Sequence, residues 1–350
     1  MTSNRQFIGS WAVASPPLII DQAAAEAFLR KHYSDRLSTR TFNVIGKIFR
    51  HPSVLKRHFA IDRPETFLTE NADEKMERFT RGALSLSSQA ALAAMKDAGI
   101  ESNDITGIVA NTCTGYICPG LSTYLIENLG LNRNILAYDL VGSGCGGAIP
   151  NLQICQALLK EERHQAILSI SVEICSATYQ MKEDLSLIVS NAIFGDGAAA
   201  AIVWNRPKGL TLLASASRYA PEYRDDIRFV YQNGQLHNQL SQRLPKLVGR
   251  TVSALITDFL KEQGLVFEDI QHWILHNGGE KIIEAVKKEL NLTEKQIQPT
   301  RAVLADYGNM SSVTVWFGLE QIRKNLKPGE LCLMIAFGAG LSAHVYLLKA

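Results

Sequence analysis

The sequence predicts an α/β fold built from two similar halves, and three observations support this. Two long segments, 91–115 and 255–279, both read as an amphipathic helix, a glycine stop, a short turn and a buried strand. Within them, Gly99 precedes Asp104 by the same interval as Gly264 precedes Asp269. Further along each half, "FGDGAAAAIVW" (194–204) resembles "FGAGLSAHVYL" (337–347).

Two matches in the same order favour a duplicated unit, with halves at 1–205 and 206–350 and sheets packed against shared helices. An alternating α/β fold without a repeat is the alternative. Each half is expected to carry a further strand and helix, "ILAYDLVGSGCGGAIPNLQICQALL" and "AVLADYGNMSSVTVWFGLEQI". Each then has another buried strand, "QAILSISVE" or "ELCLMIAF", and closes on a glycine-rich hairpin. Segment 207–250 is less regular, and its Asn233-Gly234 pair predicts a hairpin that covers a pocket.

Composition indicates an ordinary globular protein. The chain has 350 residues, of which 46% are hydrophobic and 20% charged, with a net charge of +2. Because no basic block stands out, nucleic acid is a poor candidate partner. No apolar run approaches the length of a transmembrane helix, and the N-terminus is a weak match to a signal peptide. The six cysteines form no zinc-site spacing and no small disulfide framework, which predicts reduced thiols in a cytoplasmic protein without a metal site.

One cysteine lies in an unusual setting. In "DLVGSGCGGAIPNLQ" (139–153), Cys145 falls between a pattern typical of a fully buried strand and the start of a helix. The free N–H groups of a helix N-terminus stabilise a thiolate and lower the pKa of the thiol. The surrounding glycines permit a tight turn and the approach of a substrate. The pattern therefore suggests a nucleophilic thiol, although a small buried residue at a glycine-rich turn is the plainer explanation.

Two polar residues in the second half occupy sister loops. His276 ends a buried strand in "HWILHNGG", and Asn309 lies in "DYGNMSS", which the repeat makes equivalent to the Cys145 loop. A Cys-His-Asn set suits acyl-transfer chemistry, because histidine accepts the thiol proton and both partners donate hydrogen bonds to an oxyanion. A lone histidine at a strand end is more often structural, but the repeat predicts that all three loops open on one face.

These motifs resemble the type III polyketide synthases, the chalcone-synthase-like branch of the thiolase fold superfamily. The resemblance runs from about residue 40 to the C-terminus. It rests on "NTCTGYICPGL" (111–121), "GCGGA" (144–148), "FGDGAAA" (194–200), "HNGG" (276–279), "YGNMSS" (307–312) and "FGAGL" (337–341). "FGDGA" and a reactive cysteine also occur in β-ketoacyl carrier-protein synthase III. The resemblance implies a thiolase-like fold, two duplicated α/β halves in a layered αβαβα arrangement, and a homodimer.

The resemblance also implies the chemistry. Cys145 matches the nucleophile that takes a starter acyl group from acyl-CoA, and His276 and Asn309 match the pair that binds the thioester carbonyls. The implied reaction is an iterative decarboxylative Claisen condensation with malonyl-CoA, followed by closure to a pyrone or resorcinol. CoA thioesters are the substrates, and no further cofactor is implied.

Ten other positions match substrate-binding sites of the family. Phe194 matches an aromatic gatekeeper, and Gly278 and Gly279 match backbone beside the pantetheine arm. Cys118 matches a residue that reaches across a dimer interface, and the remaining positions match cavity or CoA-phosphate sites. The cavity matches are Cys113, Cys175, Thr178 and Ser311, and the phosphate matches are Lys47 and Arg50, for which solvated surface charge is an equal alternative.

Departures from the family pattern bear on the substrate. The family's second gatekeeper phenylalanine is replaced in "LHNQLSQRLP" by Leu240, Ser241 or Gln242, and Ala339 stands where relatives often have proline. With cysteines at two cavity positions, these differences favour a fatty acyl starter over a bulky aromatic one. The cysteine-rich phrases look like bacterial alkylpyrone or alkylresorcinol synthases.

Three other functions compete with this one. A single-round ketosynthase of the β-ketoacyl synthase III type adds one unit, either to initiate a fatty acid or to couple two acyl chains. Hydroxymethylglutaryl-CoA synthesis requires an acidic base near the thiol, for which Glu173 is the candidate. An acyl-binding protein without activity is expected to lack one of the three predicted catalytic residues, and all three are present.

Overall fold

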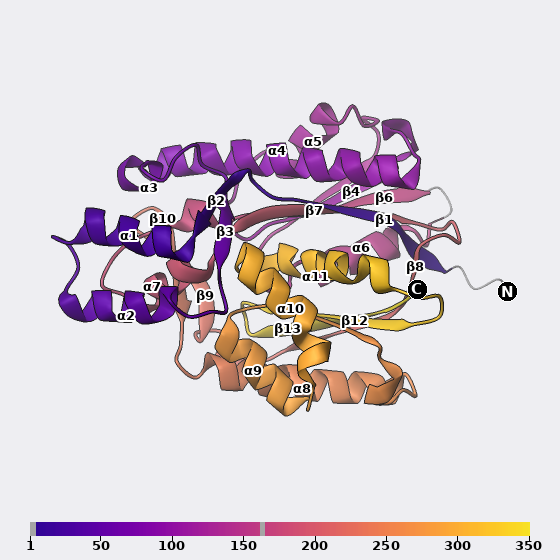
Figure 1. Cartoon of the computed structure of the whole chain (residues 1–350). Helices are drawn as coiled ribbons and strands as arrows, with labels where there is room; N and C mark the ends of the chain where they lie inside the picture. The colour runs from indigo at the N-terminus through magenta and orange to yellow at the C-terminus, as the bar shows by residue number, and fades with distance from the viewer. Residues whose placement is uncertain (1–4, 162–164) are drawn as a thin grey trace.

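The computed structural model describes residues 5–161 and 165–350. Within these residues, nine strands form one sheet that is bent into two halves (Figure 1). In spatial order they are β11 (His272–Leu275), β12 (Leu331–Gly338), β13 (Ser342–Lys349), β8 (Leu210–Tyr219), β1 (Gln6–Ala14), β7 (Asp196–Trp204), β6 (Ala166–Ile174), β4 (Gly107–Asn111) and β5 (Leu136–Leu140). The halves join where β1 pairs with β8 over three residue pairs.

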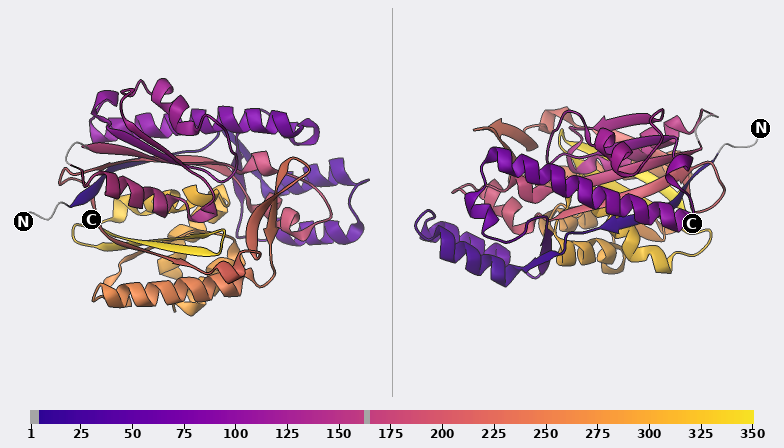
Figure 2. Two further views of the ribbon diagram at one scale, coloured as in Figure 1. Left: turned by 180° about the vertical axis from the view of Figure 1, so that it is seen from behind. Right: turned by 90° about the horizontal axis from the view of Figure 1, so that it is seen from above.

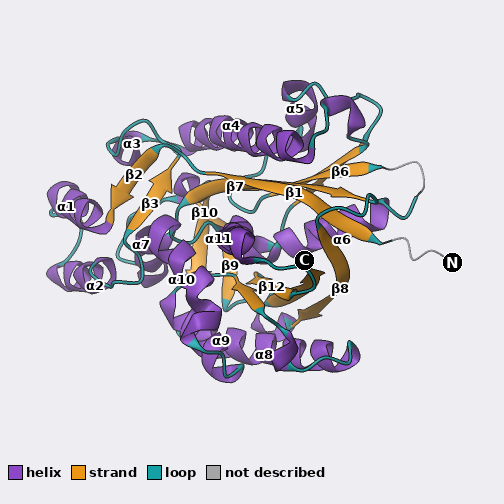
Figure 3. Cartoon of the chain, turned by 45° about the vertical axis from the view of Figure 1, so that its right-hand side comes forward, coloured by secondary structure: helices purple, strands orange, loops and turns teal. Residues whose placement is uncertain are grey.

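The helices form three layers around the two half-sheets, which gives the order αβαβα (Figure 3). The middle layer holds α6 (Ala148–Leu158) and α11 (Thr314–Ile322), and the apolar cluster around these two helices draws on both half-sheets. The outer layers are α4 (Ala72–Ala98) with α5 (Leu121–Asn128) on one side, and α8 (Leu244–Glu262), α9 (Glu280–Glu289) and α10 (Glu294–Tyr307) on the other. The predicted layered, thiolase-like arrangement is confirmed, and the division at residues 205 and 206 stays a prediction.

A lobe projects beyond one end of the layers (Figure 2). It contains α1 (Gln22–Tyr33) and α2 (Thr39–Phe49), which pack against α7 (Leu185–Ile193) through a separate apolar cluster. Two small sheets lie at this end, β2 (Leu18–Asp21) with β3 (Lys56–Phe59), and β9 (Ile227–Gln232) with β10 (Gln235–Leu240), and the short helix α3 (Thr66–Thr69) follows β3. The predicted Asn-Gly hairpin is confirmed, since Asn233 and Gly234 join β9 to β10 with φ of 53° and 72°.

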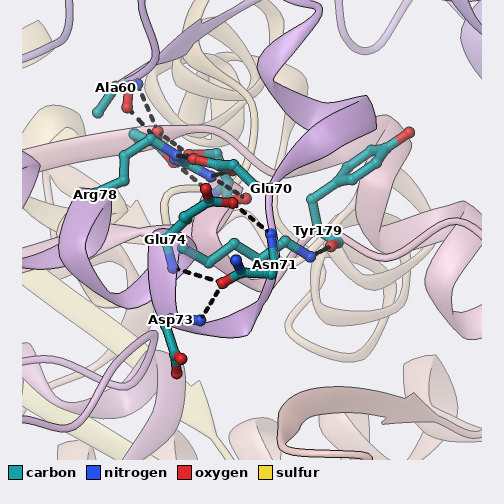
Figure 4. Close-up of polar contacts among 10 residues, drawn as sticks. Ala60, Glu70, Asn71, Asp73, Glu74, Arg78 and Tyr179 are labelled. Atoms are coloured by element: carbon teal, nitrogen blue, oxygen red, sulfur yellow. Dashed lines mark hydrogen bonds and ion pairs between the residues drawn. The ribbon is translucent and has the colours of Figure 1, made fainter.

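Segments 91–115 and 255–279 are alike because in each of them a helix is followed by a glycine in the left-handed conformation. The long helix α4 starts at a capping box, in which the Asn71 side chain accepts from the N–H of Glu74 and the Glu74 carboxylate accepts from the N–H of Asn71 (Figure 4). It stops at Gly99, whose φ is 72°, and α8 is followed by Gly264 with φ of 67°. A single 3-10 turn follows each glycine and leads into β4 or β11.

The predicted order of elements is wrong at two places. Residues 302–307 form the last turns of α10, where a strand was expected. Val303 packs into the cluster between the half-sheets and Leu304 into the outer cluster, so this helix is apolar on more than one side, and a short buried apolar run does not distinguish helix from strand. The expected hairpin in the first half is also absent, because residues 175–195 form a 3-10 turn and α7 between β6 and β7.

The strand before Cys145 is not fully buried, contrary to the prediction. β5 is the edge of the sheet and pairs only with β4 among the described strands. Tyr138 at its centre is 42% exposed, and Val141 just beyond it is 54% exposed. The apolar side chains of Tyr138 and Val141 are therefore partly exposed to solvent in the single chain. Within the described residues, no helix is both long and apolar enough to span a membrane.

Candidate active site

The predicted nucleophile lies on a turn between β5 and α6, here called the Cys145 turn (residues 141–147). A 3-10 turn over Gly144–Gly146 leads directly into α6, as the sequence predicts. The end of β12 packs against this turn so closely that a Cβ atom on Gly338 would lie 2.5 Å from the Ser143 carbonyl oxygen and 2.9 Å from the Cys145 nitrogen. Glycine is therefore required at 338, because the second half of the sheet supports the nucleophile's backbone directly.

The equivalent turn in the second half, here called the Asn309 turn (residues 308–313), contacts the Cys145 turn. Ser311 Oγ lies 3.2 Å from Cys145 Sγ and 3.1 Å from Cys113 Sγ. The Ser311 N–H donates to Asn309 Oδ1 at 2.8 Å. Since this bond occupies the carboxamide oxygen, the Asn309 NH₂ group is the end that remains to donate to a substrate.

His276 is 1% exposed and directly follows β11. Its Nδ1 lies 2.5 Å from Thr314 Oγ1, and that hydroxyl donates to the Ser311 carbonyl at 2.8 Å. The imidazole also meets the Phe337 ring edge to face, with centroids 4.8 Å apart. The Asn309 turn and the start of α11 therefore connect all three predicted catalytic residues.

The backbone of Asn309 is fixed from the other side by the segment around Phe194. The Asn309 N–H donates to the Ile193 carbonyl at 2.7 Å, and the Gly195 N–H donates to the Asn309 carbonyl at 3.1 Å. Phe194 thus lies beside Asn309, where a gatekeeper would be needed. Cys175 Sγ is 3.9 Å from the same Asn309 carbonyl oxygen, which places this predicted cavity residue next to the catalytic set.

Burial controls the charge state of the site. It raises the pKa of the Cys145 thiol to about 12 and lowers the pKa of His276 to about 3. The expectation that a helix N-terminus lowers the thiol pKa is therefore wrong in the free enzyme, because desolvation outweighs the favourable hydrogen bond from Ser311. At neutral pH the pair is a thiol and a neutral imidazole, and proton transfer has to accompany substrate attack.

Glu173 is fully buried close to this site but its oxygens are occupied. Its carboxylate accepts from the Ser312 hydroxyl at 2.6 Å, from the Cys113 N–H at 2.9 Å, and from the hydroxyls of Thr114 and Thr112 at 2.9 and 3.2 Å. Four donors satisfy a carboxylate, so Glu173 fixes the position of residues 112–114 after β4. This arrangement argues against Glu173 as the free acidic base of a hydroxymethylglutaryl-CoA-type reaction.

The segment that carries Cys175 and Thr178 is held by buried polar contacts. Thr178 Oγ1 donates to the Cys175 carbonyl at 2.8 Å, and Asp196 accepts from both the N–H and the hydroxyl of Ser176. Arg78 binds the Ser176 carbonyl and pairs with Glu70 in two-point contact, as Figure 4 shows for the guanidinium. Thr178 makes no hydrogen bond to the predicted catalytic residues within the described part of the chain, so its substrate role stays a prediction.

The other predicted binding residues lie further out. Gly278 and Gly279 follow His276, and Gly279 begins α9 with φ of 125°. Lys47 is exposed on α2, and Arg50 is tied to Glu26 at 2.8 Å beside a surface cavity of about 630 Å³. Cys118 is exposed in the loop between β4 and α5. The structure therefore does not bring these outer residues into contact with Cys145.

Two features escaped sequence reasoning. Thr314, which binds His276, and Asn277, whose Nδ2 donates to the Gly308 carbonyl at 2.9 Å, link the sister loops. Both are polar residues in apolar runs next to a motif, and that is the only signal that points to them. For the missing gatekeeper, Leu240 lies at the end of β10, where Ser186 of α7 binds its backbone, whereas Gln242 is exposed.

The chain is similar to known proteins over almost its whole length. Residues 22–258 match the family described as FAE1/type III polyketide synthase-like protein, and residues 211–350 match the C-terminal domain of chalcone and stilbene synthases. A curated relative, the 3,5-dihydroxyphenylacetyl-CoA synthase of Streptomyces toyocaensis, is 28% identical over 97% of this chain and 92% of its own length.

Two solved structures are similar over almost the whole chain. PKS-I of the brown alga Ectocarpus siliculosus has a TM-score of 0.90 and 25% identity, covering 99% of this chain and 98% of that chain. The C-terminal type III polyketide synthase domain of Steely1 from Dictyostelium has a TM-score of 0.90 and 26% identity, covering 99% of both chains. The chain therefore belongs to the type III polyketide synthase family of condensing acyltransferases and shares their thiolase-like fold.

Proposed function

We propose that this enzyme loads an acyl-CoA starter on Cys145 and extends it with malonyl-CoA in several decarboxylative Claisen condensations. The observation that carries the proposal is the Asn309 turn. Through Ser311 this turn contacts the thiol and orients the carboxamide, and Thr314 at the start of α11 binds the imidazole. The turn and the start of α11 thus prepare a nucleophile, a proton acceptor and a hydrogen-bond donor in a buried site.

Loading begins with the neutral pair. The Cys145 thiol transfers its proton to His276 as its sulfur attacks the acyl-CoA carbonyl, and the tetrahedral oxyanion collapses to expel CoA thiolate. That thiolate takes a proton from solvent and leaves as CoA-SH, while the thiol proton stays on His276, so the enzyme carries one more positive charge after loading than before. Because burial keeps the thiol protonated, an approaching thioester is needed to make proton transfer favourable.

Extension uses hydrogen-bond donation. When malonyl-CoA loses CO₂, negative charge develops on its thioester oxygen, and the Asn309 NH₂ group and protonated His276 stabilise it as an enolate. The enolate carbon attacks the Cys145 thioester, the new carbon–carbon bond forms as the carbon–sulfur bond breaks, and the released Cys145 thiolate takes its proton back from His276. Donors fixed before the reaction stabilise the transition state more than the ground state, and a buried site strengthens this effect.

The starter and product are the finer part of the proposal. A fatty acyl starter and closure to a pyrone or resorcinol are supported by the absence of an aromatic residue in "LHNQLSQRLP" and by the small side chains of Cys113 and Cys175 near the site. The reaction as written needs no cofactor besides CoA thioesters and suits a cytoplasmic enzyme. Addition of EDTA to the assay checks the first point.

A homodimer is supported by the exposed edge of the sheet. An edge strand with exposed apolar side chains, here β5 with Tyr138 and the adjacent Val141, is a favourable site for association with a second copy. Light scattering on the purified protein checks this, and a monomer at micromolar concentration contradicts it.

A single-round ketosynthase is the second candidate, because the matched family description includes FAE1-type proteins. The deciding experiment incubates the purified protein with malonyl-CoA and acyl-CoAs from acetyl to stearoyl, with one aromatic starter, and analyses products by mass spectrometry. Products with two or more added units support iteration, and products with one unit support the alternative.

A further inference from the structure

The contacts of His276 determine which of its two ring nitrogens carries the proton. Thr314 Oγ1 lies 2.8 Å from the Ser311 carbonyl oxygen and 2.5 Å from His276 Nδ1. Two oxygens this close repel unless a proton lies between them, and a carbonyl has none to give. The Thr314 hydroxyl proton therefore points to Ser311, and the same hydroxyl oxygen accepts from His276.

The surroundings of Thr314 leave little freedom to reverse the directions of these two hydrogen bonds. His276, Ser311 and Thr314 are all nearly fully buried, so water is not at hand to replace a lost partner. The Ser311 carbonyl accepts from the backbone N–H of Thr314 as well as from its hydroxyl, which uses both of its lone pairs. Ser311 itself has φ of 50°, a left-handed conformation that aims its N–H at Asn309 and its carbonyl at Thr314.

We propose that Thr314 is a positioning residue that holds His276 in the Nδ1–H tautomer and thereby makes Nε2 the basic nitrogen of the active site. The inference rests on the proposed role of His276 as the proton acceptor for Cys145. With the hydroxyl in place, neutral His276 presents a lone pair at Nε2 and accepts the thiol proton there. The resulting imidazolium then donates from Nε2 to the thioester oxygen, so one fixed tautomer serves both steps.

The test compares Thr314→Val, which removes the hydroxyl at nearly constant shape, with Thr314→Ser, which keeps it. Thr80→Val is the matched control, because Thr80 Oγ1 also donates to a preceding carbonyl, that of Met76, but lies on α4 away from the site. The first readout is the ¹⁵N spectrum of histidine-labelled protein, with the His276 signals assigned by their loss in His276→Gln. This readout needs no substrate and stays informative if the proposed reaction fails.

We expect the Nδ1–H tautomer in the wild type, in Thr314→Ser and in Thr80→Val, and a shift toward Nε2–H in Thr314→Val. The rate of Cys145 acylation, followed by intact-protein mass, should fall about 10- to 100-fold in Thr314→Val and stay within about 3-fold in Thr314→Ser. A wild-type spectrum with Nε2–H, or an unchanged tautomer in Thr314→Val, overturns the proposal. If Cys145 is acylated faster in Thr314→Val than in Thr314→Ser, the proposal is also overturned, because that order indicates that Thr314 acts through packing alone.

Discussion

The Cys145 turn and the Asn309 turn occupy equivalent places in the two halves, but they differ in how they are built. The Cys145 turn is rich in glycine, its backbone is supported by the end of β12, and its thiol is the one reactive side chain. In the Asn309 turn, polar side chains and backbone groups bind one another and reach across to the first half. In the proposed mechanism the first half supplies the reacting atom, whereas the second supplies the groups that accept the proton and stabilise negative charge.

Each turn also packs on a buried histidine. His276 binds the Asn309 turn through Thr314, and His344 of β13 lies beneath the Cys145 turn, where a Cβ atom on Gly146 would approach its ring to 2.7 Å. Burial lowers the pKa of both, to about 3 and about 4. We therefore expect the same physical environment to serve a chemical role for His276 and a packing role for His344. This division predicts that substitutions in the two turns fail in different ways.

The largest effect is expected from Cys145→Ala. Without the thiol no acyl-enzyme forms, and turnover should fall by at least about 10⁴-fold, the scale seen when a nucleophile is removed. Intact-protein mass spectrometry after incubation with acyl-CoA measures loading. Cys155→Ala, which removes a buried thiol ten residues later in the same helix region, is the control and should load normally. Acylation of Cys145→Ala at another cysteine would show that the nucleophile is misassigned.

Asn309→Ala should separate the two chemical steps. Loading at Cys145 should persist, because the thiol and His276 are untouched, whereas release of CO₂ from malonyl-CoA should fall about 10²- to 10³-fold with the loss of one oxyanion donor. Intact mass and CO₂ release measure the two steps on one preparation. Asn128→Ala, an exposed change at the end of α5, is the control. Equal loss of both steps contradicts the proposed division of labour between the turns.

Support of the Cys145 turn by β12 is tested with Gly338→Ala. The added methyl meets the Ser143 carbonyl at 2.5 Å, so the turn or the strand has to move, and we expect a loss of about 3 kcal/mol in the free energy of unfolding. Gly130→Ala is the matched control. Its φ is 60° but a Cβ there meets no atom within 4 Å, so it should cost only about 1 kcal/mol. Urea denaturation measures the free energy of unfolding of both variants, and equal losses in the two exclude steric contact as the cause.

The sequence was sufficient for the duplicated fold because its signals are local. Glycine stops at 99 and 264, an Asn-Gly hairpin and period-matched apolar runs each fix one element through backbone geometry. The same reasoning failed at residues 302–307, since the last turns of α10 pack into two apolar clusters and a short apolar run does not reveal a helical period. It also misjudged β5, because an apolar strand has the same sequence pattern at the centre of a sheet and at an exposed edge.

The three predicted catalytic residues could be named from the sequence, but the contacts that connect them could not. Cys145, His276 and Asn309 stand in motifs, and the repeat relates their loops, but nothing local joins Ser311 to Cys145 or Thr314 to His276. Such contacts depend on how the half-sheets pack around α6 and α11. The raised thiol pKa has the same origin, because burial is a property of the folded layers, whereas a helix start is visible in the chain.

The last prediction concerns the effect of acid on the free energy of unfolding, which is expected to act through buried His344. An unfolded histidine binds a proton below its ordinary pKa of 6.5, whereas folded His344 does so only near 4, so protonation favours unfolding. Its contribution to stability is fully present above pH 6.5 and is lost as the pH falls toward 4, by about 3 kcal/mol. No charged side chain is among its described contacts, which are Ser217, Tyr219 and Gly146.

His344→Gln should therefore flatten the acid limb of the stability curve. The free energy of unfolding, measured by urea at pH 7 and pH 4, should fall by about 3 kcal/mol less in this variant than in the wild type, while exposed His51→Gln should follow the wild type. If His344→Gln retains the full acid loss, the titrating group lies elsewhere, and His276→Gln becomes the next variant. If it flattens the curve yet keeps acyl loading, the histidine under the Cys145 turn serves packing, and the histidine beside the Asn309 turn alone serves chemistry.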